Sequence, residues 1–76
     1  MSSKLSILWL EAFVAVAKSG SLQGAAVRSG LSSSTLSSHL QKLEAHLGAP
    51  LFDHSKRPLV LTGNGHRFLQ HAEAVL

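Results

Sequence analysis

The sequence predicts a small, mainly α-helical domain that contains a helix-turn-helix and a β-hairpin. Three observations lead to this fold class. Apolar residues recur at helical spacing in four stretches, short glycine-containing turns join the first three, and an apolar–basic–apolar segment precedes the fourth. The chain has 76 residues and no cysteine, so neither a disulfide nor a thiolate metal site can supplement its core.

The first two helices are expected over residues 5–18 and 22–29. Gly20 is a natural C-terminal stop for the first helix, and Ser21 can cap the start of the second. The apolar stripe expected to bury the first helix comprises Ile7, Leu10, Phe13, Val14 and Ala17. A second glycine-containing turn follows the second helix, which completes the helix-turn-helix pattern with the third.

The third helix is expected over residues 33–47, capped by Ser32 and ended by Gly48. Its buried side is expected to consist of Leu36, Leu40, Leu43 and Leu47. The opposite side is short and polar and carries Ser34, Ser37, Ser38 and Gln41, flanked by Lys42. A solvated helix usually carries Glu, Lys and Arg there, because these are better helix formers. Hydroxyls and an amide suit base edges in the DNA major groove and nearby phosphates, so this face is predicted to contact DNA.

Residues 51–61 are expected to form a β-hairpin, called the wing below, whose polar tip carries Lys56 and Arg57. These cations could reach the DNA backbone or the minor groove. A fourth helix is expected after Thr62, which can cap it. Its apolar stripe comprises Phe68, Leu69, Ala72, Val75 and Leu76. Residues 63–65, Gly-Asn-Gly, are weak helix formers, so the first turn of this helix is expected to fray.

Charge and motifs exclude several other classes of protein. Lys and Arg outnumber Asp and Glu by seven to four, a net charge of +3 that suits a polyanionic partner. The apolar N-terminal stretch resembles a secretory signal, but Glu11 interrupts it. No apolar run is long enough to span a membrane, so the chain is predicted to be cytoplasmic. No catalytic residue is predicted, because no nucleophile elbow or phosphate loop occurs, and the histidine spacings predict no metal site.

Taken in order, these segments resemble the N-terminal DNA-binding domain of LysR-type transcriptional regulators. "LEAFVAVAKSGSLQGAA" is similar to the family's first two helices, and "LSSSTLSSHLQKLEAHLGAPLF" to its recognition helix and the turn after it. "RPLVLTGNG" resembles the second wing strand and the start of the linker helix. The resemblance implies a winged helix-turn-helix over residues 4–62, with a three-helix core and a β-hairpin wing. Residues 63–76 would then be the start of a dimerisation linker helix.

The resemblance also implies the partners and the site residues. Helix 33–47 would enter the major groove of double-stranded DNA, and wing 51–61 would lie on the backbone or minor groove. The residues expected to bind DNA are Ser32, Ser33, Ser34, Ser37, Ser38, Gln41, Lys42, His54, Lys56 and Arg57. The residues expected at a homodimer interface are Trp9, Phe68, Leu69, Ala72 and Leu76. The dimer would read an interrupted inverted repeat in the bacterial cytoplasm, at the nucleoid. No cofactor is expected in this chain, since a small-molecule inducer would bind the effector domain with which family members continue.

The sequence departs from the family pattern at several of these positions. The family often has arginine at Ser38 and His54, proline at Ser34 and glutamine at Ser33, so weaker affinity or a shifted base preference is expected here. Ser29 stands where a leucine usually packs under the second helix, and Val27 is a candidate to compensate. One alternative stays open: a protein-interaction module that uses Trp9, which otherwise completes the core, together with the stripe of the fourth helix.

Overall fold

Short N-capped helices, tight glycine turns and one hairpin make up residues 6–76, the part of the chain that the computed structural model describes. The elements are α1 (Ile7–Ser19), α2 (Leu22–Ser29), α3 (Ser33–Leu47), β1 (Phe52–Asp53), β2 (Val60–Leu61) and α4 (Gly63–Val75). The expected domain start at residue 4 and helix start at residue 5 lie outside the described residues. The mainly α-helical winged helix-turn-helix predicted from the sequence is therefore confirmed, and α2 and α3 have the predicted bounds.

Serine and threonine hydroxyls fix where the helices begin. Ser21 accepts a hydrogen bond from the backbone N–H of Gly24 at 3.0 Å, and Ser32 accepts one from Thr35 at 3.1 Å. The turn between α1 and α2 requires a left-handed residue, which Gly20 provides with a φ of 78°. Gly30, also with a φ of 78°, provides the corresponding residue in the turn between α2 and α3, which completes the helix-turn-helix.

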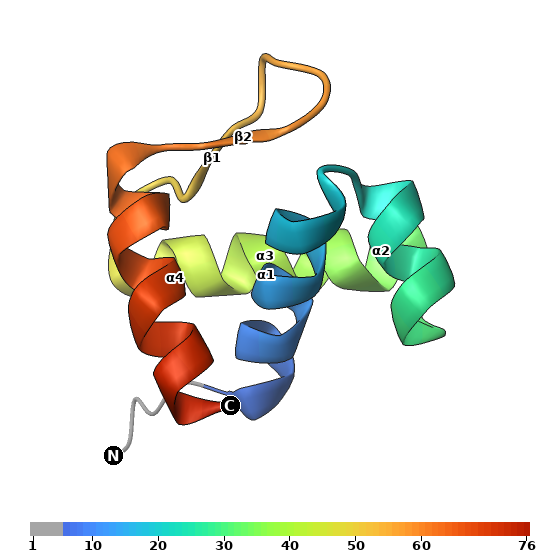
Figure 1. Ribbon diagram of the computed structural model, residues 1–76, viewed down its shortest axis with the longest axis horizontal. Coiled ribbons are helices and arrows are strands. Elements are labelled where there is room, and N and C mark those ends of the chain that lie inside the picture. Colours follow the sequence, from blue (N-terminus) through green and yellow to red (C-terminus); the bar gives the residue numbers. More distant parts are fainter. Residues whose placement is uncertain (1–5) are drawn as a thin grey trace.

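The core lies where α1, α2, α3 and α4 converge below the wing. Figure 1 shows α3 crossing behind α1, with α2 and α4 on opposite sides and the wing above. Phe13 is fully buried, with ring-centroid distances of 5.4 Å to both Phe52 and Phe68. The buried residues are Leu10, Ala12, Phe13, Val16, Ala25, Leu36, Leu40, Leu43, Leu51, Phe52 and Ala72.

Two residues assigned to the core from helical spacing lie outside it and are partly exposed. Ile7 is 51% exposed and Leu47 is 36% exposed, since they lie in the first turn of α1 and the last turn of α3. Val16, which the predicted stripe omitted, is fully buried. It is covered because α1 packs against α2, α3 and α4, so more than one stripe of this helix is buried.

The start of α4 packs directly onto the base of the wing. A Cβ atom added to Gly65 would lie 2.1 Å from the carbonyl oxygen of Leu51 and 2.9 Å from Cδ2 of Leu61. Thr62 caps α4, and its backbone N–H donates to the same Leu51 oxygen at 2.9 Å. A glycine is therefore needed in this turn to let α4 approach the hairpin. Fraying of residues 63–65 stays a prediction, opposed by this capped and packed geometry.

A shallow hollow lies beside Ser29, at the position where the family usually has leucine. Its volume is about 230 Å³, and Leu8, Ala12 and Leu36 contribute to its lining. Val27 does not compensate for the missing side chain, because it is 85% exposed. Of its apolar lining residues, Leu8 is 57% and Leu31 is 40% exposed.

We expect Ser29→Leu to raise the free energy of unfolding by about 1 kcal/mol. The leucine would cover the apolar lining of the hollow, at the cost of the 3.2 Å bond that Leu31 N–H donates to the serine hydroxyl. Urea denaturation monitored by circular dichroism measures the change. Val27→Leu is the matched control and should change stability by less than about 0.5 kcal/mol. A lower stability for Ser29→Leu would contradict the prediction.

None of the helices within residues 6–76 combines the length and the apolar character that crossing a membrane requires.

Candidate nucleic-acid interface

A groove opens between the exposed side of α3, the start of α2 and the wing. Its volume is about 440 Å³. The groove brings together five of the ten residues predicted to bind DNA, namely Ser33, Ser37, Gln41, His54 and Arg57. The remaining lining residues are Ser21, Leu22, Gln23, Leu40 and Leu59. The predicted polar face of the third helix and the predicted wing therefore form two walls of one concave surface.

The other predicted DNA-binding residues lie around the groove. Ser34 and Lys42 are exposed on α3 and Ser38 is half-buried there, and none of the three lines the groove. Lys56 is exposed near the tip of the wing. The polar surface of α3 is thus wider than the groove and continues outward from it.

Ser32 has a structural role. Its hydroxyl accepts the bond from Thr35 N–H and donates to the hydroxyl of Thr35 at 2.9 Å. By capping α3, it leaves the backbone N–H groups of Ser33 and Ser34 as the unpaired donors of the first turn. No residue of this turn is acidic, so the positive end of the helix can attract a phosphate.

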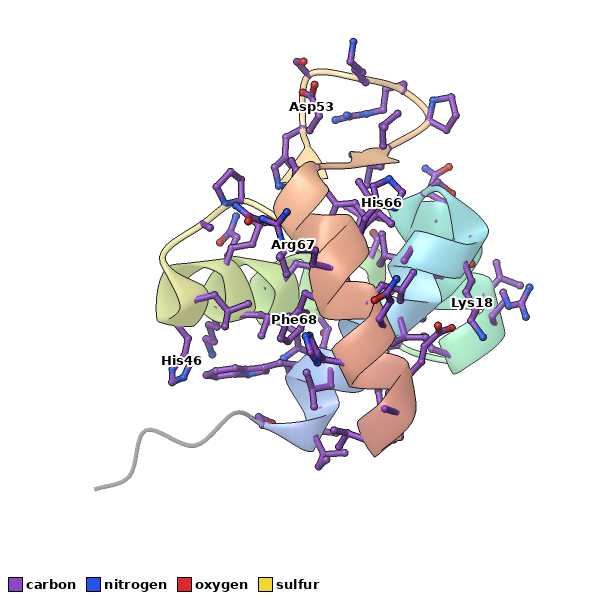
Figure 2. All side chains as sticks on the ribbon, turned by 60° about the vertical axis from the view of Figure 1, so that its left-hand side comes forward. Lys18, His46, Asp53, His66, Arg67 and Phe68 are labelled. Carbon is purple, nitrogen blue, oxygen red and sulfur yellow. The ribbon has the colours of Figure 1, made fainter. Side chains whose placement is uncertain are left out.

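The wing tip is ordered by its own side chains. Ser55 donates to the Asp53 carboxylate from its hydroxyl at 2.6 Å and from its backbone N–H at 3.1 Å. These two bonds hold the pKa of the Asp53 carboxyl below its ordinary value. Arg57 Nη1 donates to the carbonyl oxygens of His54 and Lys56, at 2.9 and 2.8 Å. Figure 2 shows Asp53 in the wing, beyond the N-terminal end of α4.

Glu44 anchors the wing to α3, a role that the sequence did not predict. Its Oε2 accepts hydrogen bonds from the backbone N–H groups of Leu51 at 2.7 Å and Phe52 at 3.2 Å. The same carboxylate lies 3.1 Å from Nε2 of His54. His54 was predicted to contact DNA, and its bond to Glu44 holds its ring toward α3. Just before β2, Leu59 N–H donates to the Gly20 carbonyl oxygen at 3.0 Å.

Sequence reasoning also missed Ser21 and Gln23, which extend the groove onto α2. No local signal in the sequence indicates this, because the approach of the start of α2 to α3 and the wing depends on how the elements pack. Periodicity along α3 alone does not include them.

One of the residues predicted at a dimer interface, Ala72, has almost no exposed surface with which to contact a second chain. It is only 1% exposed and belongs to the core of its own chain, because α4 packs this face against α1. Phe68 is half-buried and contacts Phe13, and Figure 2 shows it on the α4 face toward the core. Leu69 and Trp9 are also half-buried, and the indole contacts the ring of His46.

On α1 and α4, the large apolar side chains that remain exposed lie at the beginning of α1 and at the end of α4. The exposed fractions are 51% for Ile7, 57% for Leu8, 64% for Val75 and 50% for Leu76. Lys18 and Glu73 join the same two helices by an ion pair of 3.4 Å. Of the predicted interface residues, Leu76 is the one with the most accessible surface.

The ring of His54 bonds Glu44, and no serine hydroxyl among residues 6–76 hydrogen-bonds that ring. In the same range, no three His, Asp or Glu side chains gather as a metal site would require.

A three-helix core, a polar recognition face and a basic hairpin beside it define the winged helix-turn-helix class. Within that class, residues 7–66 match the family described as "Bacterial regulatory helix-turn-helix protein, lysR family". The chain belongs to this family, as the segments quoted above predicted.

Individual relatives agree with this assignment. The chain is 43% identical over 72 residues to the HTH-type transcriptional regulator ShiR of Corynebacterium glutamicum, covering 95% of this chain and 24% of ShiR. It is 48% identical over 71 residues to a probable hydrogen peroxide-inducible genes activator of Mycobacterium avium, covering 93% and 23%. The chain thus spans about a quarter of the length of these curated relatives.

Solved structures place the same fold on DNA. The DNA-binding domain of BenM in complex with benA site 1 DNA superposes with a TM-score of 0.89 at 34% identity, covering 92% of this chain and 79% of that one. The CbnR DNA-binding domain in its DNA complex gives 0.88 at 37% identity, covering 92% and 80%. Nothing in these relatives supports the alternative of a protein-interaction module.

Proposed function

We propose that this chain binds double-stranded DNA sequence-specifically, as the DNA-binding part of a bacterial LysR-type transcriptional regulator. The observation that carries the proposal is the groove in which Ser33, Ser37 and Gln41 face Arg57 of the wing. DNA complexes of the related BenM and CbnR domains support it.

In this proposal, α3 enters the major groove along its polar face. The hydroxyls of Ser33 and Ser37 pair with base edges, and the Gln41 amide suits bidentate contact with adenine. The free N–H groups at the start of α3 and the cations Lys56 and Arg57 bind phosphates on either side. Base contacts then supply specificity, while the phosphate contacts set the register.

Two copies would bind together through the exposed apolar surface of α1 and α4. Each copy would read one half-site, so the preferred DNA would be an interrupted inverted repeat. Such a regulator acts in the bacterial cytoplasm, at the nucleoid, and has no catalytic role. DNA binding by this chain would need no cofactor, and an inducer would act on an effector domain of the kind that family members carry.

The first experiment is selection of tight binders from a random duplex pool at moderate salt, after circular dichroism has verified the helix content. Enrichment of an interrupted inverted repeat supports a dimer that reads two half-sites. The affinity for the enriched duplex should also fall steeply with salt, since bound phosphates release counterions. A folded chain that binds no duplex would contradict the proposed function.

We expect Ser38→Arg to strengthen binding to the enriched duplex by about tenfold or more, because a bidentate arginine contact to guanine contributes roughly 1–3 kcal/mol. Ser38 is half-buried on α3, on the side that carries the other polar residues of the recognition helix. Fluorescence anisotropy with the labelled duplex measures the change, and Ser38→Gln, which adds length without charge, is the control. Weaker binding by Ser38→Arg would show that this surface does not face the bases.

A further inference from the structure

The hairpin of the wing is too short to fix its own direction. Its ladder consists of two residue pairs between β1 and β2. An isolated hairpin of two strands is marginally stable at best, so contacts outside the ladder must hold it against the helices. Just before β2, the wing is tied to the turn between α1 and α2 by the bond from Leu59 N–H to the Gly20 carbonyl oxygen. At β1 the wing is tied to α3 instead, and this tie is made by a side chain.

Glu44 is the side chain that ties β1 to α3. Its Oε2 accepts from the backbone N–H groups of Leu51 at 2.7 Å and Phe52 at 3.2 Å. Nε2 of His54 lies 3.1 Å from its Oε1. The Glu44 side chain is 15% exposed, and the side chains of Leu51 and Phe52 are buried in the core. A backbone N–H left without a partner inside the protein is costly, so this carboxylate stabilises the place where the wing leaves the core.

The hydrogen bonds continue from Glu44 through His54 to Arg57. His54 bonds Glu44 through its ring, while its carbonyl oxygen accepts from Arg57 Nη1 at 2.9 Å. The same guanidinium nitrogen donates to the carbonyl oxygen of Lys56 at 2.8 Å. His54 and Arg57 both line the groove, whereas Glu44 does not. One residue, His54, thus joins the carboxylate to a cation of the groove wall.

We propose that Glu44 is a positioning residue for DNA binding, which holds the wing, and through His54 the Arg57 guanidinium, beside the polar face of α3. This inference rests on the proposed function, since it takes duplex DNA as the ligand of the groove. Its consequence is opposite to that of charge alone. A carboxylate near a DNA-binding surface repels phosphates, so by charge alone its removal tightens binding. By positioning, removal of the same carboxylate weakens binding.

Two variants remove the same negative charge but differ in hydrogen bonding. Glu44→Ala leaves the wing without this acceptor, whereas Glu44→Gln keeps one side-chain oxygen that can accept from the backbone N–H groups. We expect Glu44→Ala to weaken binding to the selected duplex by about tenfold or more, and Glu44→Gln by a smaller factor, in fluorescence anisotropy. Circular dichroism checks that each variant is folded, and Glu44→Gln carries the test if Glu44→Ala is not.

Glu11→Ala is the matched control for the change of charge. Glu11 is exposed on α1 and does not line the groove, so its replacement should not weaken binding. If both Glu44 variants bind the duplex as tightly as wild type or more tightly, the positioning role is refuted.

A double-variant cycle separates positioning from a general loss of structure. Because Glu44 acts through Arg57 in this proposal, Glu44→Ala should weaken binding by about threefold or less once Arg57→Ala is present. In the Ser37→Ala background it should keep its full effect, since Ser37 lies on α3 itself. Equal losses in the two backgrounds would contradict an action through Arg57.

A measurement on the free chain distinguishes failure of this inference from failure of the proposed function. The heteronuclear NOE of an arginine Nε–H group reports the order of its side chain on the ps–ns timescale. In Glu44→Ala it should fall for Arg57 and stay unchanged for Arg67, which bonds Asn64 within α4. An unchanged Arg57 signal would overturn the positioning role even if the duplex binds. Loss of order at Arg57 in a chain that binds no duplex would support the positioning of the wing and contradict the proposed function.

Discussion

Gly65→Ala is expected to lower the free energy of unfolding by about 3 kcal/mol or more, a large share of the total stability of so small a domain. The added methyl group would lie 2.1 Å from the Leu51 carbonyl oxygen, a backbone atom that cannot rotate away. To relieve the clash, α4 must move off the base of the wing and expose Leu51 and Phe52, which are now buried. Denaturation in urea, followed by circular dichroism, measures the loss.

Gly63→Ala is the matched control for this substitution. Gly63 lies in the same turn of α4, but a Cβ atom there meets nothing within 4 Å. Alanine at this position should leave stability unchanged or raise it by up to about 1 kcal/mol, because it reduces the freedom of the unfolded chain. If both variants lose the same stability, the close approach at Gly65 is not the cause.

Ser37→Glu is expected to weaken binding to the selected duplex by on the order of 100-fold while leaving the fold intact. Ser37 lines the groove from α3, so a carboxylate there would repel the phosphates and base acceptors of the duplex and would compete with them for Arg57 on the facing wall. Electrophoretic mobility shift with the same duplex measures the loss, and circular dichroism checks the fold.

Val27→Glu changes the net charge of the chain by the same amount and serves as the control. Val27 is 85% exposed on α2 and does not line the groove, so this variant should bind within about threefold of wild type. Comparable losses for both variants would mean that overall charge, rather than the polar face of α3, governs binding.

The helices were predictable from the sequence because their signals are local. Ser21 and Ser32 cap the helices that they were expected to cap, and Gly48 ends α3 with a φ of 72°. Each of these signals involves side chains and backbone within about four residues, which a sequence displays directly. The polar face of α3 and the basic tip of the wing were likewise predicted from short stretches of sequence. That the two line one groove was not predicted.

What could not be predicted depends on contacts between distant residues. Glu44 was one polar residue on the side of a helix until the hairpin folded back and placed two backbone donors on it. Gly65 was expected to weaken its helix, and the structure shows that its missing side chain allows a contact with Leu51. Ala72 was assigned to a partner because one helical stripe can face either a second chain or its own core. Periodicity does not show whether the stripe is covered by a second chain or by the core of its own chain.

The contact between Gly65 and Leu51 also couples two parts of the molecule mechanically. Because Gly65 has no side chain, the backbone of α4 packs directly against the backbone at the base of the wing. The hydrogen bond from Thr62 N–H to the same Leu51 oxygen adds a second contact. A tilt of α4 would therefore displace the base of the wing. In a pair of chains joined along α4, the crossing angle of the two helices would set the distance between the two wings. The spacing of the two half-sites that the pair can bind would then depend on contacts along α4, at the end of the domain farthest from the DNA.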